Sequence, residues 1–254
     1  MQDLQLDGKN PNLLNIELSV GRKVVKLSFC VNIMKLGILF SGGKDSALAA
    51  WFAKKEDNEL KCLITIDSKN KDSFMFHTPS ISRVGEQAKQ MNLPLIIVET
   101  EGEKEKELKD LEKAILKAKE KYNIEGVITG AVESVYQATR VQKICNKLNI
   151  ECFNPLWQKN QIDILKTLIE EKFEIIIIGV MAYPLDEKFL GKKIDKEFIE
   201  EMKTLQEKYK INPAGEGGEF ESFTMNCPLF ENALEIKSFE DFGGSHSWRR
   251  ELNL

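Results

Sequence analysis

The residues best suited to chemistry form one short run, Ser41-Gly-Gly-Lys-Asp-Ser46, in which hydroxyls, an amine and a carboxylate surround two glycines. The run follows the apolar segment Leu36–Phe40 and precedes Ala47–Ala50, which gives the order strand, glycine turn, helix. Gly42 and Gly43 lack the Cβ atoms that would keep a phosphate from the backbone. Successive N–H groups can then form an anion nest at a helix N-terminus. The run therefore predicts a phosphate-binding loop.

The side chains of this loop are those that a polyphosphate needs. Ser41 and Ser46 can donate hydroxyl hydrogen bonds, and Lys44 brings a positive charge. Asp45 alone would repel an anion, so we expect it to hold Mg²⁺, which in turn binds phosphate oxygens. The spacing does not match a Walker A loop, because Gly43 stands where that motif needs lysine. An ordinary glycine turn is the alternative, and six specified residues in this context disfavour it.

A second polar run, from Gly130 to Arg140, follows another predicted strand and therefore lies at the carboxyl edge of the sheet, where ligands bind. On the helix that begins there, Ser134, Gln137 and Arg140 are three residues apart on roughly one face. Arg140 can present a planar fork to phosphate or carboxylate. An arginine paired with a surface acid is an equally good explanation of Arg140 alone.

Two further candidates lie elsewhere in the chain. His77 follows a predicted strand by a loop and stands beside Thr78, which favours a ligand contact, with a packed or surface histidine as the alternative. A glycine-rich turn presents three carboxylates, those of Glu216, Glu219 and Glu221. Carboxylates this close repel one another unless a cation or hydrogen-bond donors compensate. The turn is thus a candidate cation site, and a solvated acidic hairpin is the alternative.

The elements that position these residues alternate between apolar runs and amphipathic segments. The expected strands are 35–40, 61–67, 94–99, 126–129, 151–154 and 174–181, and the expected helices are 45–54, 80–91, 104–122, 133–148 and 163–173. This alternation predicts βαβ units and a parallel sheet covered on both faces. After Pro184 the pattern changes to a charged helix, glycine turns and short strands. We therefore expect a main domain at 34–184 and a smaller one at 185–254.

Residues 1–33 precede this pattern. They contain two short alternating runs, 14–20 and 24–31, around Gly21, which would suit an extra β-hairpin. We favour a different interpretation, in which the segment is an N-terminal extension from a misassigned start and Met34 is the first residue. The reason is that a Rossmann-type domain normally starts with its first strand.

Composition narrows the class of function. The net charge of −4, from 36 basic and 40 acidic residues, gives no surface-wide positive field, so nucleic acid is disfavoured as a partner. The five cysteines form no CxxC pair, which argues against a disulfide framework, a thiolate zinc site and sulfur transfer, and agrees with a reducing cytoplasm. No apolar run approaches the roughly 20 residues of a membrane helix. We expect a cytoplasmic protein with no membrane partner, and the oligomeric state stays open, a homo-oligomer included.

The run Ser41–Ser46 resembles the PP-loop of the N-type ATP pyrophosphatases, which include GMP, asparagine and NAD synthetases, tRNA-thiolating enzymes and diphthine–ammonia ligases. The resemblance implies an α/β fold of the adenine-nucleotide α-hydrolase type, with a parallel Rossmann-like sheet and a smaller C-terminal α+β domain. It also implies that ATP, with Mg²⁺, is split into AMP and pyrophosphate while a substrate oxygen is activated as its adenylate.

Four further segments resemble the diphthine–ammonia ligase family and occur in the family's order. They are 74–80, which contains His77; 130–140, with the pattern Gly-x-x-x-Ser-x-Tyr-Gln-x-x-Arg; 185–195; and 212–222. Together with the loop they span about residues 34 to 235. The resemblance implies an AMP-forming C–N ligase for the last step of diphthamide synthesis. Such an enzyme amidates the diphthine carboxylate on translation elongation factor 2, and free ammonium is the expected nitrogen source.

This interpretation gives each candidate residue an expected role. The nucleotide is expected at Ser41, Gly42, Gly43, Lys44, Asp45, Ser46, His77 and Gly130, with Mg²⁺ at Asp45 and catalytic roles for Lys44, Asp45 and Arg140. The acceptor is expected at Ser134, Tyr136, Gln137, Arg140, Glu216, Glu219 and Glu221, where the carboxylates would face the trimethylammonium group of diphthine. Another PP-loop enzyme, such as a tRNA-modifying one, is the first alternative, and the pI of about 5.5 disfavours it. A non-catalytic ATP-binding regulator is the second.

Overall fold

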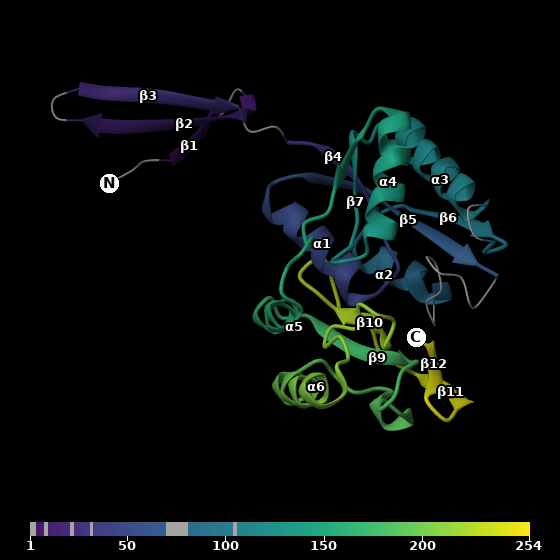
Figure 1. Cartoon of the computed structure of the whole chain (residues 1–254). Coiled ribbons are helices and arrows are strands. Elements are labelled where there is room, and N and C mark those ends of the chain that lie inside the picture. The colour runs from purple at the N-terminus through teal and green to yellow at the C-terminus, as the bar shows by residue number, and fades with distance from the viewer. Residues whose placement is uncertain (1–3, 8–9, 21–22, 31–32, 70–80, 104–105) are drawn as a thin grey trace.

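The computed structural model describes residues 4–7, 10–20, 23–30, 33–69, 81–103 and 106–254 (Figure 1). The predicted ligand residue His77 and the rest of segment 74–80 therefore lie outside the described residues. No helix in the described part of the chain is both long enough and apolar enough to span a membrane.

The expected parallel sheet is present and confirms the α/β fold class. Its strands are β4 (Lys35–Leu39), β5 (Glu59–Ser68), β6 (Leu95–Thr100), β7 (Gly126–Ile128) and β8 (Glu151–Phe153), all parallel and in the order β6-β5-β4-β7-β8. The helices between them are α1 (Lys44–Lys55), α2 (Val84–Gln90, after the short 3₁₀ turn Ile81–Arg83), α3 (Lys106–Tyr122) and α4 (Val135–Leu148). Chain order reverses between β4 and β7, the place where such sheets bind ligands.

These strands are apolar on both faces because helices cover both faces. On one face Ile38 of β4 packs in the same core as Ala50 of α1 and Ala88 of α2. On the other face Ile64 of β5 packs with residues of α3 and α4, including Ile115. Figure 1 shows these two helices side by side along the sheet. Continuous apolar runs in the sequence thus correspond to strands that are buried from two sides.

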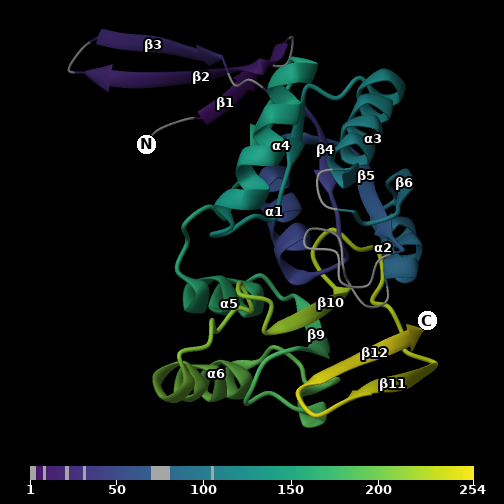
Figure 2. The ribbon, with the colours of Figure 1, turned by 45° about the vertical axis from the view of Figure 1, so that its right-hand side comes forward.

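A second, antiparallel sheet follows. It contains β9 (Glu174–Val180), β10 (Phe220–Asn226), β11 (Ser238–Gly244) and β12 (Ser247–Asn253) in the order β10-β9-β12-β11. The helices α5 (Gln161–Glu170) and α6 (Lys196–Tyr209) lie beside it (Figure 2). One hydrophobic core runs from α1 through α5 and β9 to α6, so the two sheets are parts of one continuous packed body.

The position of β9 differs from the prediction. The sequence placed the strand 174–181 in the parallel sheet, because its apolar run is typical of a strand buried on both faces. Instead β9 pairs antiparallel with β10 and β12, and its two-sided burial comes from α5 and α6 on one side and from Phe223 and Leu252 on the other. The boundary between residues 184 and 185 stays a prediction, and the place of β9 favours a boundary before α5.

The N-terminal strands β1 (Leu4–Asp7), β2 (Asn10–Val20) and β3 (Lys23–Cys30) form an antiparallel sheet of their own. In Figure 1 it projects to one side of the two other sheets. β2 and β3 are the hairpin that the alternating pattern suited. The interpretation of residues 1–33 as an extension from a misassigned start stays a prediction.

A shortened chain that starts at Met34 is expected to unfold at the same temperature as the full chain and to keep full activity. The reason is that hydrogen bonds attach Met34 to the rest of the parallel sheet domain. The N–H of Met34 donates to Asn58 Oδ1 at 3.1 Å, and its carbonyl accepts from Glu59 N at 2.9 Å. Thermal unfolding of both chains measures the effect. A clearly lower melting temperature of the shortened chain would show that the β1–β3 sheet stabilises the body.

Candidate active site

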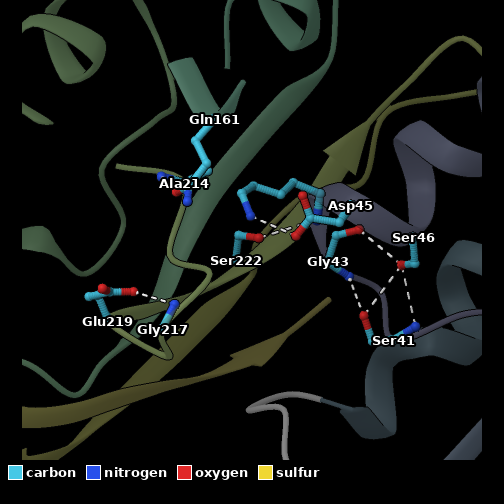
Figure 3. A network of polar contacts seen from close by, with 10 residues as sticks. Ser41, Gly43, Asp45, Ser46, Gln161, Ala214, Gly217, Glu219 and Ser222 are labelled. Atoms are coloured by element: carbon cyan, nitrogen blue, oxygen red, sulfur yellow. Dashed lines mark hydrogen bonds and ion pairs between the residues drawn. The ribbon is translucent and has the colours of Figure 1, made fainter. Parts of the chain in front are cut away.

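The loop Ser41–Ser46 connects β4 to α1 at the point where the strand order reverses. Gly42 has φ +83°, a left-handed conformation that suits glycine. Gly43 is the N-cap of α1, and its N–H donates to Ser41 Oγ at 3.3 Å. The hydroxyls of Ser41 and Ser46 also lie 3.3 Å apart (Figure 3). The loop therefore gathers two hydroxyls and the first N–H groups of a helix, which together suit an anion.

The second polar run reaches this loop through its backbone. A Cβ atom added to Gly130 would lie 2.7 Å from the carbonyl carbon of Asp45 and 2.7 Å from the nitrogen of Ser46. These contacts leave no room for a side chain. Gly130 is therefore required for β7 and α1 to approach each other, and the two motifs that the sequence singled out are in direct contact.

The carbonyl of Gly42 is held by two donors, an arrangement that we call the Gly42 clamp. Thr224 N donates to Gly42 O at 2.9 Å, and Gln87 Nε2 donates to it at 3.0 Å. Gln87 Nε2 also donates to Thr224 O at 2.8 Å, and Gln87 is completely buried. These hydrogen bonds hold the carbonyl oxygen of Gly42 on the side of β10. Because the N–H of Gly43 belongs to the same peptide, it points away from that strand. The second sheet is thus part of the support of the loop.

Sequence reasoning missed the residues of the clamp. One signal was available for Gln87, which falls with Val84, Ala88 and Met91 on the apolar face of the predicted helix 80–91. A buried amide on an apolar face needs hydrogen-bond partners. For Thr224 the sequence carries no signal, because only its backbone takes part.

Lys44 and Asp45 form the charged centre of the loop. Lys44 is 4% exposed, and its Nζ lies 2.6 Å from Asp45 Oδ2 and 5.5 Å from the centre of the Phe220 ring. Burial alone would lower the pKa of Lys44, but the carboxylates of Asp45, Glu216 and Glu221 outweigh burial and raise it. Lys44 therefore stays positively charged at neutral pH.

Two carboxyls of the acidic turn share this environment. Burial, reinforced by Asp45 and partly offset by Lys44, raises the pKa of Glu216 to about 8; Glu133 and Glu219 add smaller effects in the same direction as burial. Burial also raises the pKa of Glu221 to about 7, again against Lys44 and with Asp45. At pH 7 and without a further cation, Glu216 is therefore mainly protonated and Glu221 is about half protonated. A cation bound beside them would favour their charged forms.

Glu219 has a different place from its two neighbours in sequence. Its Oε1 accepts hydrogen bonds from Asn212 N at 2.8 Å and from Asn212 Nδ2 at 2.7 Å. Its Oε2 accepts one from Gly217 N at 2.8 Å (Figure 3). The residue is 7% exposed. These hydrogen bonds connect Asn212 and Gly217 through one carboxylate, so Glu219 stabilises the loop that contains Glu216. The predicted contact of Glu219 with the acceptor stays a prediction, and this geometry does not favour it.

Gln161, at the start of α5, links the acidic turn to the second polar run. Its Oε1 accepts from Ala214 N at 3.1 Å, and its Nε2 lies 3.2 Å from both Asn212 Oδ1 and Glu133 Oε2. Sequence reasoning gave Gln161 no role. The amide fixes the relative positions of two candidate acceptor-binding segments that come from different parts of the chain.

The folded protein without ligands is expected to lose stability as pH rises from about 4.5 to about 8. Glu216 and Glu221 hold protons in the folded state that the unfolded chain, with pKa values near 4.5, has released. Their stabilising contribution is therefore complete below that value and is lost as pH passes about 7 and then about 8. Melting temperatures across this range measure it.

The matched variants are Glu221→Gln and, as a control, Glu207→Gln at an exposed position of α6. Glu221→Gln should flatten the pH dependence because the amide does not titrate, whereas Glu207→Gln should follow the wild type. An equally steep decline in Glu221→Gln would contradict the assignment.

The helix α4 positions the remaining predicted residues. Ser134 is its N-cap and accepts a hydrogen bond from Gln137 N at 3.3 Å, so its hydroxyl has a structural role. The Arg140 guanidinium lies over the ring of Tyr136, 3.4 Å from its centre. Both side chains are half-buried. The second polar run thus ends in a stacked pair of an aromatic ring and an arginine on α4.

An apolar pocket of about 150 Å³ opens beside the loop at the carboxyl edge of the parallel sheet. Aliphatic side chains from β4, β5, α3 and α4 dominate its lining, and Ser41, Thr129 and Gln137 contribute polar atoms. Thr129 Oγ1 in turn donates to Asn154 Oδ1. An apolar slot with a few polar groups beside a phosphate loop suits the base of a nucleotide.

The oxygen atoms beside the loop also suit a Mg²⁺ ion that is bound together with phosphates. Asp45 Oδ1 is buried and has no hydrogen-bond partner among the residues that the structure describes, so one hard oxygen is available beside the loop. Within that same part of the chain, no three His, Cys, Asp or Glu side chains are grouped as a metal site. A Mg²⁺ ion here would take its other ligands from phosphate oxygens and water, as this ion usually does.

Comparison with known proteins shows what the chain resembles. Residues 34–152 match the family model described as "Diphthamide synthase N-terminal domain", and residues 160–250 match "Diphthamide synthase C-terminal domain". Diphthine–ammonia ligase of Rattus norvegicus is 34% identical over 229 residues, which cover 82% of this chain and 84% of that protein. The Homo sapiens protein of the same name is 33% identical over the same coverage.

A solved structure from Methanocaldococcus jannaschii, described as a predicted subunit of tRNA methyltransferase, aligns with 77% of this chain and 98% of its own. The identity is 20% and the TM-score is 0.39. A TM-score this low supports no conclusion about function.

Proposed function

This chain belongs to the diphthine–ammonia ligase family, and on that premise we propose that it converts diphthine, ammonium and ATP into diphthamide, AMP and pyrophosphate. The acceptor is the modified histidine of translation elongation factor 2. A cytoplasmic location, as the sequence predicts, would bring the enzyme together with this acceptor. The observation that carries the proposal is the loop Ser41–Ser46, in which the buried Lys44 is paired with Asp45 beside an apolar pocket.

The same loop and pocket would hold ATP. The base enters the pocket lined by Phe40 and Thr129, and the phosphates lie against the N-terminus of α1. Mg²⁺, held at Asp45, would neutralise charge on the phosphates. Lys44 stays protonated because carboxylates surround it, and it can therefore stabilise the negative charge that develops on the leaving pyrophosphate.

The acceptor approaches from the side of the second sheet. An oxygen of its carboxylate attacks the α-phosphorus, and pyrophosphate leaves toward the loop. Ammonia then attacks the activated carbonyl carbon and displaces AMP. Glu216 and Glu221 would face the trimethylammonium group, whose positive charge would favour the ionised form of both carboxyls. Arg140 would hold the acceptor carboxylate through its planar fork.

The test is a reconstituted reaction with elongation factor 2 that bears diphthine, ATP, Mg²⁺ and ammonium. We expect one AMP and one pyrophosphate for each amide formed, with the amide detected by mass spectrometry of the elongation factor. Reactions without ammonium or with unmodified elongation factor are the controls. ADP and phosphate as products, or pyrophosphate release that leaves the acceptor unamidated, would contradict the proposal.

A further inference from the structure

Strand β10 passes the phosphate loop with Ser222 against it. Ser222 Oγ accepts a hydrogen bond from Lys44 N at 3.2 Å. The pairing of β10 with β9 is irregular at this point, because Glu221 pairs with Gly179 and Ser222 pairs with Ile177, which leaves Ile178 of β9 as an extra residue. Irregular pairing of this kind is common beside active sites. Strand β10 thus brings a hydroxyl to the start of α1.

Ser222 lies directly against the start of α1. The serine is 5% exposed, and a Cβ added to Gly43 would come within 3.2 Å of Ser222 O and 3.5 Å of Ser222 Oγ. Figure 3 shows its hydroxyl beside Gly43 and Asp45. The first N–H groups of a helix have no partner within the helix, and anions bind to them. Ser222 therefore lies at the edge of the place where a phosphate would bind.

The hydroxyl of Ser222 has a proton to give. A serine hydroxyl is one donor and accepts up to two hydrogen bonds. One acceptor position is taken by the N–H of Lys44, and no residue in the described ranges accepts the hydroxyl proton. The position of the serine is also fixed, because the Gly42 clamp attaches β10 to the loop two residues later, at Thr224. Charged acceptors such as phosphate oxygens form the stronger hydrogen bonds.

We propose that Ser222 is a ligand of the pyrophosphate part of ATP: its hydroxyl accepts the Lys44 N–H and donates its own proton to a phosphate oxygen. The inference rests on the proposed function of the loop and extends it. The phosphate site is then composite, with the loop from the parallel sheet and one hydroxyl from the antiparallel sheet.

Inorganic pyrophosphate is the probe, and its affinity is measured by calorimetry in the presence of Mg²⁺. Ser222→Ala should weaken binding about tenfold or more, because a hydrogen bond to a charged group is lost. The KM for ATP should rise by a similar factor, with a smaller change in kcat. Ser222→Thr, which keeps a hydroxyl, should bind better than the isosteric Ser222→Val. Ser238→Ala, on the exposed edge strand β11, is the matched control and should bind as the wild type.

Three results would overturn the inference. If Ser222→Ala melts at a lower temperature but binds pyrophosphate as the wild type, Ser222 only caps α1. If it binds pyrophosphate more tightly, the serine competes with phosphate for the Lys44 N–H. If Ser222→Ala does not fold, equal affinities of the Thr and Val variants would exclude a role for the hydroxyl. A wild type that itself neither binds nor releases pyrophosphate would instead refute the proposed function of the loop, and the inference with it.

Discussion

Lys44→Ala is expected to lower the rate of pyrophosphate release roughly a thousandfold, the usual effect of removing a group that stabilises developing charge. Lys44 is buried, stays protonated and lies 2.6 Å from Asp45, so its charge is fixed in place before ATP arrives. Without Lys44 the loop offers the leaving group no positive charge, only N–H and O–H dipoles. Asp45 and two nearby carboxyls remain in place without a positively charged partner. Ser46→Ala, which removes a hydroxyl within 3.3 Å of Ser41 Oγ, should act in the same direction.

The measurement is release of pyrophosphate in a coupled assay, with circular dichroism to establish that the variants are folded. Lys54→Ala is the matched control, since it removes an exposed lysine from the last turn of the same helix. It should react at the wild-type rate. Normal turnover by a natively folded Lys44→Ala would refute the assignment of the loop.

Glu219→Gln is expected to lower the stability of the protein, whereas Glu216→Gln is expected to lower its activity toward the acceptor. Both variants replace one carboxylate by an amide in the same turn. In Glu219→Gln an NH₂ group must face donors that now bond to the carboxylate, either those of Asn212 or Gly217 N. Leaving buried donors without an acceptor should lower the free energy of unfolding by about 2–4 kcal/mol. Denaturant titration measures this loss.

Glu216→Gln should leave the free energy of unfolding within about 1 kcal/mol of the wild type, because no hydrogen bond of the turn depends on Glu216 in the described structure. It should instead lower kcat/KM for the diphthine-bearing acceptor roughly tenfold and spare the affinity for ATP. Amidation followed by mass spectrometry, beside calorimetry with ATP, separates the two. Wild-type amidation by both variants would mean that the turn does not contact the acceptor. A collapse of ATP affinity in Glu216→Gln would place its carboxylate at the metal instead.

The parts of the site that the sequence predicted are those built from consecutive residues. The turn Ser41–Ser46 is specified by two glycines between an apolar strand and an amphipathic helix, and local pattern alone determines such a unit. Gly130 was placed at the same sheet edge because the carboxyl ends of parallel strands meet there, and the structure brings it against Asp45 and Ser46.

The parts that it did not predict depend on contacts between distant segments. The place of β9 could not be read from its apolar run, because burial on both faces looks the same whether a parallel or an antiparallel sheet provides it. Ser222 bonds to the start of α1 and Gln161 bonds to the loop at Ala214, and a single sequence does not encode such long-range contacts as a local pattern. Glu219 was grouped with Glu216 by charge, although its hydrogen bonds to Asn212 and Gly217 give it a different role.

The clamp on the Gly42 carbonyl has a consequence for how the enzyme is made. A ribosome delivers the chain from its N-terminus, and all strands of the parallel sheet have emerged once residue 153 is out. The loop, however, also forms hydrogen bonds with β10, which is made much later. Lys44 and Ser222, which form one of these bonds, are 178 residues apart in the sequence. A nascent chain that lacks β10 can form the sheet but leaves the Gly42 carbonyl without Thr224 N. If the loop binds ATP as proposed, we expect ATP to stabilise the finished polypeptide more than a nascent chain that lacks β10.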